Sequence, residues 1–180
     1  MNLFKPALTI LIVYTILGCS GKKELKVSDL QFESIFGVKD KQSKRIYCLL
    51  GTGFIKAPSS KNSDILVSKW LKKHPDANVV PVSTFENITY CWLIDDQDTI
   101  NTYLIKNGCF PGGTMQRPET YEEMSPEMKS SFGKFKMKIY IDKKIYNKFL
   151  KQIEVAEKYA QRHTLGIWDE NYSRYPNRTK

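Results

Sequence analysis

The sequence is poor in the residues that build zinc sites. Its 180 residues include only two His and four Cys, and no two Cys form a paired CxxC motif, which leaves little room for a zinc cluster. Low-complexity segments, a collagen-like repeat and an internal period are also absent, which excludes fibrous and repeat architectures. Hydrophobic residues make up 41% of the chain and charged residues 26%, so a chain that is disordered throughout is excluded as well.

Acidic residues are fewer than basic ones. Lys and Arg number 28 against 19 Asp and Glu, which gives a net charge of +9 and a pI near 9.3 in a chain of 20.9 kDa, enough for one domain and a small appendage. This balance favours a nucleic acid, another polyanion or anionic lipid headgroups as a partner. A solvated basic surface without a specific partner explains it as well, and the residues identify no protein partner.

An apolar run at residues 7–17 indicates an export signal. Its length of about 11 residues is below the roughly 20 that a spanning helix needs but suits the core of a signal peptide, and Lys5 precedes it. The run ends in ILGC at residues 16–19, which resembles the lipobox of bacterial lipoproteins. We therefore expect residues 1–18 to be a lipoprotein signal peptide and Cys19 to be the lipid attachment site. The alternatives are an ordinary signal cut at this point and an N-terminal transmembrane anchor.

The segment that follows reads as a polar tether over residues 19–26. We expect an exported protein that is lipid-anchored to the cell membrane or outer membrane and folds in water. Export also implies an oxidising compartment. With Cys19 acylated, Cys48, Cys91 and Cys109 remain, an odd number that allows at most one intramolecular bridge, while three buried free thiols are the alternative.

Hydrophobic periodicity predicts strands and helices along the rest of the chain. The expected strands are residues 27–36, 46–50, 78–85, 88–94 and 136–141, with a hairpin turn at 37–44 and a bulge or edge position at Pro81. The expected helices are residues 64–73, 99–107 and an amphipathic helix that Asp142 caps and Gly166 ends. Residues 110–131, rich in Pro and Gly, are expected to be mostly loop with one helical turn. This order predicts an α+β fold.

Two segments resemble the staphylococcal-nuclease (thermonuclease) family. Residues 99–108, TINTYLIKNG, resemble the family's helix that reads V-N-x-x-L-V-x-x-G. Residues 153–168 resemble its final helix and the ending A-E-x-x-A-(x)4-L-G-I/L-W, through Ala156, Glu157, Ala160, Leu165, Gly166, Ile167 and Trp168. The likeness extends over residues 88–108 and 144–168, about a quarter of the chain.

The resemblance implies an OB-fold-like five-stranded β-barrel with about three helices. In this chain the domain is expected to span residues 27–170, with an enlarged loop at 111–142. Residues 171–180 form a tail that interleaves aromatic and basic side chains, a composition that suits the stacking and charge neutralisation of a single nucleic-acid strand.

The resemblance also implies a hydrolytic site. The family uses two Asp to hold Ca²⁺, a Glu as general base on water and two Arg that stabilise the charge on phosphorus. Here Lys56 and Ser59 stand where a metal Asp and the base Glu belong, and Ile88 or Thr89 stands where the late Arg belongs. Arg45 is the only arginine in the first half of the domain, where the mechanism needs two. We therefore expect the family's mechanism to be lost.

Few residues could replace the missing site. The candidate catalytic residues are Arg45, Glu33, Asp40 and Arg117, although no residue stands out as catalytic. Ca²⁺ is expected as a cofactor only if the chain is an active nuclease.

A local acidic cluster could bind a cation. It consists of Asp95, Asp96 and Asp98, but the Gly and the distant Glu of an EF-hand loop are missing. The more ordinary interpretation is a solvated turn in which Asp98 caps the next helix. His74 and His163 lie near helix ends, where capping is the ordinary interpretation too.

The sequence thus predicts a membrane-anchored, exported domain that resembles the nuclease family in fold. We expect it to be degenerate at the usual nuclease site and to bind nucleic acid or another polyanion. Two alternatives stay open: a metal-dependent phosphodiesterase with relocated catalytic residues, and a structural or interaction protein of the cell envelope. Whether the chain is an enzyme is therefore open at this point.

Overall fold

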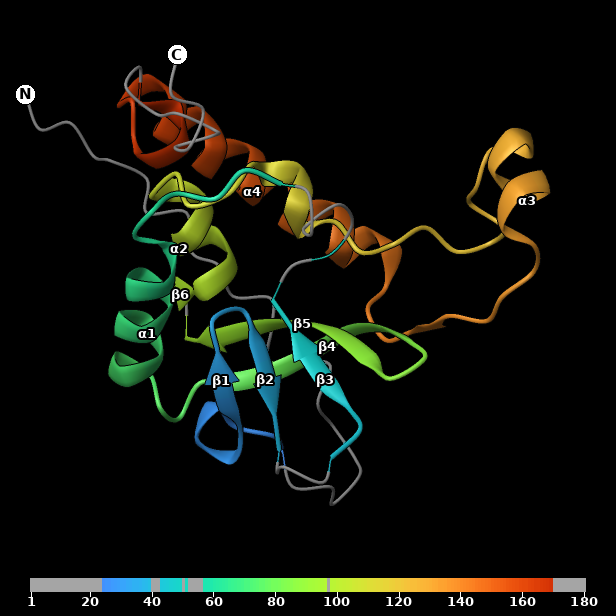
Figure 1. Ribbon diagram of the computed structural model, residues 1–180, viewed down its shortest axis with the longest axis horizontal. Coiled ribbons are helices and arrows are strands. Elements are labelled where there is room, and N and C mark those ends of the chain that lie inside the picture. The colour runs from blue at the N-terminus through green and yellow to red at the C-terminus, as the bar shows by residue number, and fades with distance from the viewer. Residues whose placement is uncertain (1–23, 40–42, 50, 52–56, 97, 170–180) are drawn as a thin grey trace, which may run out of the picture.

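The fold is α+β, as predicted, with a mixed seven-stranded sheet and four α-helices in the part of the chain that the structure describes (Figure 1). This computed structural model describes residues 24–39, 43–49, 51, 57–96 and 98–169.

The sheet is built mainly from antiparallel pairs. Its strands are β1 (Gln31–Glu33), β2 (Phe36–Val38), β3 (Ile46–Cys48), β4 (Asn78–Phe85), β5 (Ile88–Asp95), β6 (Asp98–Thr99) and β7 (Lys138–Ile139). Neighbouring strands follow the order β1-β2-β3-β5-β4-β7, and β6 pairs with β5. Only β3 and β5 are parallel among these pairs. The long β4–β5 pair confirms both strands expected there, and its register shifts between Pro81 and Ser83, as the bulge prediction requires.

The first hairpin differs from the prediction. A single strand over residues 27–36 was expected, but a 3₁₀ turn at Val27–Asp29 comes first and the chain then reverses between β1 and β2. Ser34 makes this reversal possible because its φ of 53° lies in the left-handed region. Residues 37–44, expected to be the turn, instead contain the end of β2 and the connection to β3.

The sheet is not a closed barrel, which corrects the expected five-stranded barrel. In the described part of the chain, one isolated bridge between Lys26 and Asn78 joins the segment before β1 to β4. Closure would need a continuous ladder between the first strand and β4. The 3₁₀ turn at Val27–Asp29 and the three-residue length of β1 prevent that ladder, because the chain leaves β4 before β1 begins.

The helices agree well with the prediction. They are α1 (Ser63–Lys73), α2 (Ile100–Lys106), α3 (Pro126–Phe132) and α4 (Lys143–Arg162). The cap of α4 is the predicted one: the Asp142 carboxylate accepts a hydrogen bond of 2.7 Å from the backbone N–H of Lys144. A fourth helix, α3, lies inside the segment expected to be mostly loop, and a 3₁₀ turn at Gly112–Met115 supplies the predicted helical turn.

The segment that carries α3 projects away from the body of the molecule (Figure 1). We call residues 118–137 the arm. Glycine at position 133 ends α3 with a φ of 65°, and the chain then returns to the sheet as β7, which is shorter than the strand expected over 136–141.

Helix α4 covers one face of the sheet. Trp92 of β5 lies with its ring centroid 4.1 Å from that of Phe149, and Tyr146 stacks on the same indole at 6.4 Å. The ends of α2 and α4 also meet: Gly108 has a φ of +66°, and a Cβ atom there would lie 2.0 Å from the backbone oxygen of Leu165. The two segments that carry the family resemblance therefore pack against each other.

The three cysteines of the described domain are buried, and no disulfide joins them. This decides between the two alternatives, because Cys48, Cys91 and Cys109 form no bridge in the structure. Burial raises the pKa of the Cys109 thiol to about 11 and raises that of Cys91 as well, so both are protonated at neutral pH.

Candidate functional site

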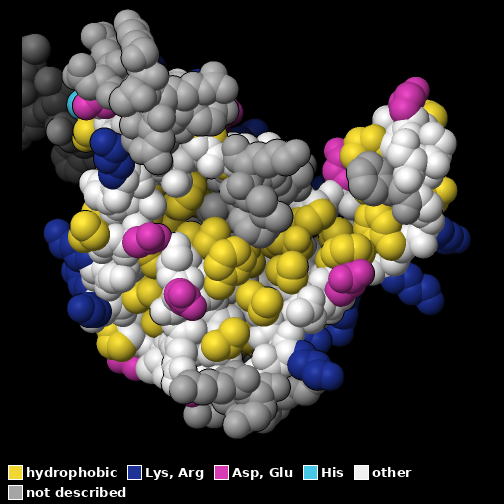
Figure 2. All heavy atoms as spheres, viewed as in Figure 1, with side chains coloured by type: hydrophobic (Ala, Val, Ile, Leu, Met, Phe, Trp, Pro, Cys, Tyr) yellow, Lys and Arg dark blue, Asp and Glu magenta, His cyan; other side chains and the backbone are white. Residues whose placement is uncertain are grey.

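The resemblance places either Ile88 or Thr89 at the position of the late arginine, and of these two Ile88 has apolar neighbours. Ile88 lies between Ile46 of β3 and Phe85 of β4 in the sheet register. Phe85 in turn contacts Phe135 of the arm edge to face, with ring centroids 5.1 Å apart. Hydrophobic side chains gather in the middle of the face shown in Figure 2, beside the base of the arm. Ile88 itself offers no cation to stabilise charge on phosphorus; the cation nearest to this position in the register is Arg45, which bonds Thr89.

Arg117, a candidate catalytic residue, already has a carboxylate partner. Its Nη1 and Nη2 atoms donate to the two carboxylate oxygens of Glu123, each at 2.8 Å, and its side chain is only 10% exposed. The Arg117 hydrogen bonds hold the pKa of Glu123 at about 2, so the pair is ionised at neutral pH. The guanidinium also lies 5.2 Å from the ring centroid of Tyr146. Arg117 is thus neutralised and fixes the base of the arm.

Beside Arg117 the surface is nearly filled. A recess of about 10 Å³, lined by Leu49, Tyr90 and Trp92 among others, has room for about one water molecule. The loop before the arm closes over the end of β3: Gly51 donates to the backbone oxygen of Thr114 at 2.6 Å, and a Cβ at Gly51 would lie 1.5 Å from the backbone oxygen of Gln116. No nucleotide fits this recess, and Gly51 is present because two backbones approach closely there.

Arg45, the second candidate arginine, is exposed and lies on another part of the sheet. Its Nη1 atom donates to the Thr89 hydroxyl at 3.1 Å. The Thr89 hydroxyl contacts that of Thr84 at 3.0 Å, and Thr84 donates to the Tyr140 hydroxyl at 3.2 Å. We call these four residues the hydroxyl row. No sequence pattern indicated it, because Thr84 lies in β4, Thr89 in β5, and Arg45 and Tyr140 lie next to the ends of β3 and β7. Only the strand register brings them together.

The remaining catalytic candidates do not join either arginine. Glu33 lies exposed in β1 and, within the described residues, forms no ion pair with Arg45 or Arg117. Asp40 and Lys56 lie outside the described residues. The structure therefore brings no acid of the described chain together with an unpaired arginine in the way that phosphodiester hydrolysis needs.

Two residues of the acidic cluster, Asp95 and Asp98, lie next to His74. The Nδ1 atom of His74, the residue after α1, donates to Asp95 at 2.5 Å, while its Nε2 atom lies 3.7 Å from a carboxylate oxygen of Asp98. The His74 ring stacks on Trp70 with centroids 4.3 Å apart. Asp96 is exposed at a turn and has a φ of 50°. Within residues 24–169, as far as the structure describes them, no group of three or more His, Cys, Asp or Glu is placed to hold a metal ion.

The capping predictions had mixed outcomes. Asp98 does not cap α2. The N-cap is the next residue, Thr99, whose hydroxyl accepts a hydrogen bond from the backbone N–H of Thr102, whereas Asp98 pairs with Asp95 in the β5–β6 ladder. His74 and His163 occupy the C-cap positions of α1 and α4, as expected. The His163 ring also contacts the backbone oxygen of Tyr159 at 2.8 Å.

The segment expected to be a signal peptide (residues 1–18), the expected lipid attachment site Cys19 and the basic tail at 171–180 lie outside the described residues. Within the described part, no helix has the length and apolar character needed to cross a membrane. The chain matches no protein-family model and no curated protein.

Proposed function

We propose that this chain is an exported lipoprotein, anchored through Cys19, whose domain binds a polyanion and does not hydrolyse phosphodiesters. The domain is proposed to be an open variant of the OB-like fold that the nuclease resemblance implies. The strand order β1-β2-β3-β5-β4 supports this, as do the positions of α1 before β4, α2 after β5 and α4 near the end of the domain.

The bidentate pair between Arg117 and Glu123 is the observation that carries the proposal. An arginine that stabilises a phosphoryl transition state must meet the developing negative charge, and Arg117 is already paired and nearly buried. The other described arginine candidate, Arg45, lies in the hydroxyl row with no carboxylate pair among the described residues. A metal-dependent hydrolase would need these groups to converge on carboxylates.

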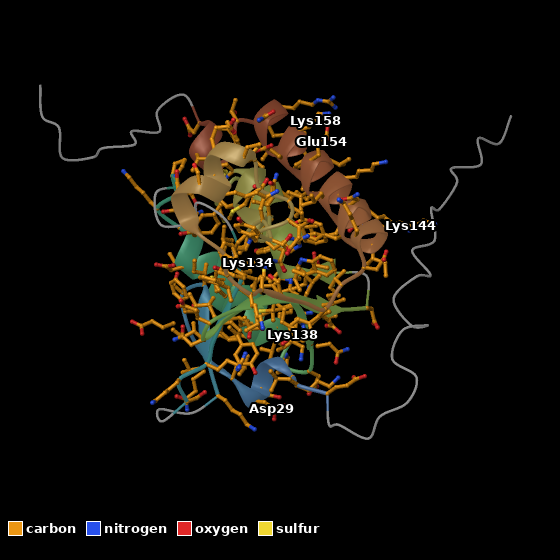
Figure 3. All side chains as sticks on the ribbon, turned by 90° about the vertical axis from the view of Figure 1, so that its right-hand side faces the viewer. Asp29, Lys134, Lys138, Lys144, Glu154 and Lys158 are labelled. Atoms are coloured by element: carbon orange, nitrogen blue, oxygen red, sulfur yellow. The ribbon has the colours of Figure 1, made fainter. Side chains whose placement is uncertain are left out.

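Exposed lysines favour polyanion binding. Between positions 134 and 151 the chain carries seven lysines and a single acid, Asp142, so this stretch is strongly positive. The lysines, all exposed, are Lys134, Lys136, Lys138, Lys143, Lys144, Lys148 and Lys151. They lie on the returning arm, β7 and the first half of α4, and Figure 3 shows Lys138 beside the strands and Lys144 projecting from α4. Such a stretch attracts a polyanion by releasing its counterions.

The test combines binding and cleavage on the full chain. Single-stranded DNA and RNA are incubated with the protein, with Ca²⁺ or with a chelator, and binding is measured over a range of salt. The proposal expects binding that weakens steeply with salt, with a slope of about −0.7 per phosphate contacted, and no cleavage. A variant with Lys134, Lys136 and Lys138 changed to Gln should bind more weakly and show a lower slope. The matched control changes Lys69, Lys72 and Lys73 of α1 to Gln.

Two outcomes contradict the proposal. Chelator-sensitive cleavage that is lost in Arg45→Ala but kept in Arg162→Ala means that the chain is a phosphodiesterase with relocated residues. No binding to either nucleic acid or to heparin at low salt means that the chain is a structural or interaction protein of the envelope.

A further inference from the structure

The hydroxyl row lies on one face of the sheet because of the strand register. Tyr47 of β3 pairs with Thr89 of β5, Thr89 pairs with Thr84 of β4, and Thr84 pairs with Lys138 of β7. Side chains of register partners lie on the same face. Four strands therefore place polar side chains next to one another, and Tyr140, two residues after Lys138, extends the same face.

The hydrogen-bond directions leave donors at both ends of the row. Arg45 donates to Thr89, and Thr84 donates to the Tyr140 oxygen, so the proton between the two threonines comes from Thr89. Each threonine proton is used within the row. The Tyr140 O–H and the remaining side-chain N–H groups of Arg45 donate to no other described residue, and three hydrogen bonds of 3.0–3.2 Å separate the two ends of the row. Thr89 is only 3% exposed, which fixes the middle of the row.

Two further groups add donors to this face. The Nζ atom of Lys138 lies 5.0 Å from the ring centroid of Tyr140. Tyr47 lies near Arg45 and Tyr140. Burial raises the pKa of Tyr47, and the positive charge of Arg45 only partly offsets this effect. The Tyr47 hydroxyl therefore keeps its proton at neutral pH. Among the described residues, no carboxylate pairs with Arg45 or Lys138. The face thus presents cations and O–H donors without a negative group bound to them.

We propose that the hydroxyl row, with Tyr47 and Lys138, is a binding site for a phosphate group. A tetrahedral oxyanion offers several acceptors and a negative charge, which match the outward donors of Arg45 and Tyr140. This inference deepens the polyanion-binding function proposed above, on which it rests for the nature of the ligand, by naming the group recognised and its residues. The group can be free phosphate or the headgroup of an anionic lipid beneath the anchor.

The experiment titrates the full chain with inorganic phosphate and follows the amide resonances of Thr89 and Tyr140 by NMR, with chloride at the same ionic strength as the control. Arg45→Gln should weaken phosphate binding about tenfold, because one charge-assisted interaction is lost. Thr84→Val should weaken it about threefold, because the row is broken without a change in charge. Arg162→Gln, which removes an exposed arginine at the end of α4, is the matched control and should bind as the parent chain does.

A second arm identifies the source of the phosphate. Vesicles of phosphatidylglycerol, compared with phosphatidylcholine vesicles, report headgroup binding. If the parent chain does not respond to inorganic phosphate, and Arg45→Gln but not Arg162→Gln loses binding to phosphatidylglycerol vesicles, the result supports the headgroup as the ligand. If the parent chain responds to inorganic phosphate and Arg45→Gln loses this response, the result supports free phosphate. Equal behaviour of Arg45→Gln and Arg162→Gln in both arms overturns the site. If that happens while salt-dependent binding to single-stranded nucleic acid persists, only this inference fails; if nucleic-acid binding is absent but the phosphate response depends on Arg45, only the wider function fails.

Discussion

Replacing Glu123 with Gln removes the carboxylate that neutralises Arg117 and leaves a side chain of the same size. Two hydrogen bonds of 2.8 Å join these residues, and the Arg117 side chain is 10% exposed. The variant therefore leaves a nearly buried guanidinium without its charged partner. At neutral pH we expect the free energy of unfolding to fall by about 1–2 kcal/mol.

The pKa of Glu123 sets this magnitude. It is lowered from 4.5 to about 2, mainly by the hydrogen bonds from Arg117. Each pKa unit corresponds to about 1.4 kcal/mol, so the shift amounts to at most roughly 3–4 kcal/mol. The Glu123 side chain is 30% exposed, and the surrounding water screens the ion pair. This screening reduces the expected loss in the free energy of unfolding to about 1–2 kcal/mol.

The same shift fixes the pH dependence. Because the folded-state pKa of Glu123 is lowered, the pair stabilises the protein fully above pH 4.5 and loses this contribution as the pH falls toward about 2. Urea denaturation of the parent chain and of Glu123→Gln should therefore differ at neutral pH and converge near pH 2. Glu122→Gln, an equal charge change at the exposed neighbouring position, should match the parent chain throughout. A Glu123→Gln deficit of the same size at both pH values would refute the reasoning, since the loss would then not depend on the carboxylate charge.

Three further predictions concern the interior. Gly108→Ala should lower the free energy of unfolding by about 3 kcal/mol or prevent folding, because its φ of +66° and a backbone oxygen 2.0 Å from the new Cβ leave no room; Gly113→Ala, which meets nothing within 4 Å, is the control, and urea denaturation compares them. Asn101→Ala should cost about 2–3 kcal/mol in the same assay, because its buried amide bonds three backbone groups; a loss below about 0.5 kcal/mol would contradict this. The thiols of Cys91 and Cys109 should react with a thiol reagent at least about 100-fold more slowly in the folded chain than in urea, since burial keeps them protonated and covered; fast labelling of the folded chain would show that they are accessible.

Local patterns predicted the helices well. The α4 helix has apolar residues every three to four positions and an Asp142 cap, and both are properties of short sequence stretches. The predicted stop at Gly166 was wrong, because α4 already ends at Arg162 and Thr164 takes the left-handed φ of 50°. The bulge at Pro81 follows from its missing N–H, whatever the surroundings. The prediction for the first hairpin was wrong because the reversal depends on a left-handed φ at Ser34. Serine rarely adopts this conformation, so its presence in the sequence does not indicate a reversal there.

For the candidate site, the sequence predicted only which residue types are present and which are missing. Counting residues was enough to show that the first half of the expected domain contains a single arginine, Arg45, and scattered acids. Counting could not show that Asp98 would turn toward His74 and leave the cap of α2 to Thr99, because this depends on how β6 pairs with β5.

By itself, the sequence determined the fold class, the positions of α1, α2 and α4 and the Asp142 cap, since each of these depends on residue type or on spacing within a short stretch. The tertiary structure alone decided what the remaining polar groups do. Glu123 meets Arg117 because the arm folds back on its own base, and Thr84 meets Thr89 because β4 and β5 pair in one register. Hydrogen bonds need atoms within about 3 Å of each other, and a sequence does not contain the register and loop paths that bring distant residues that close.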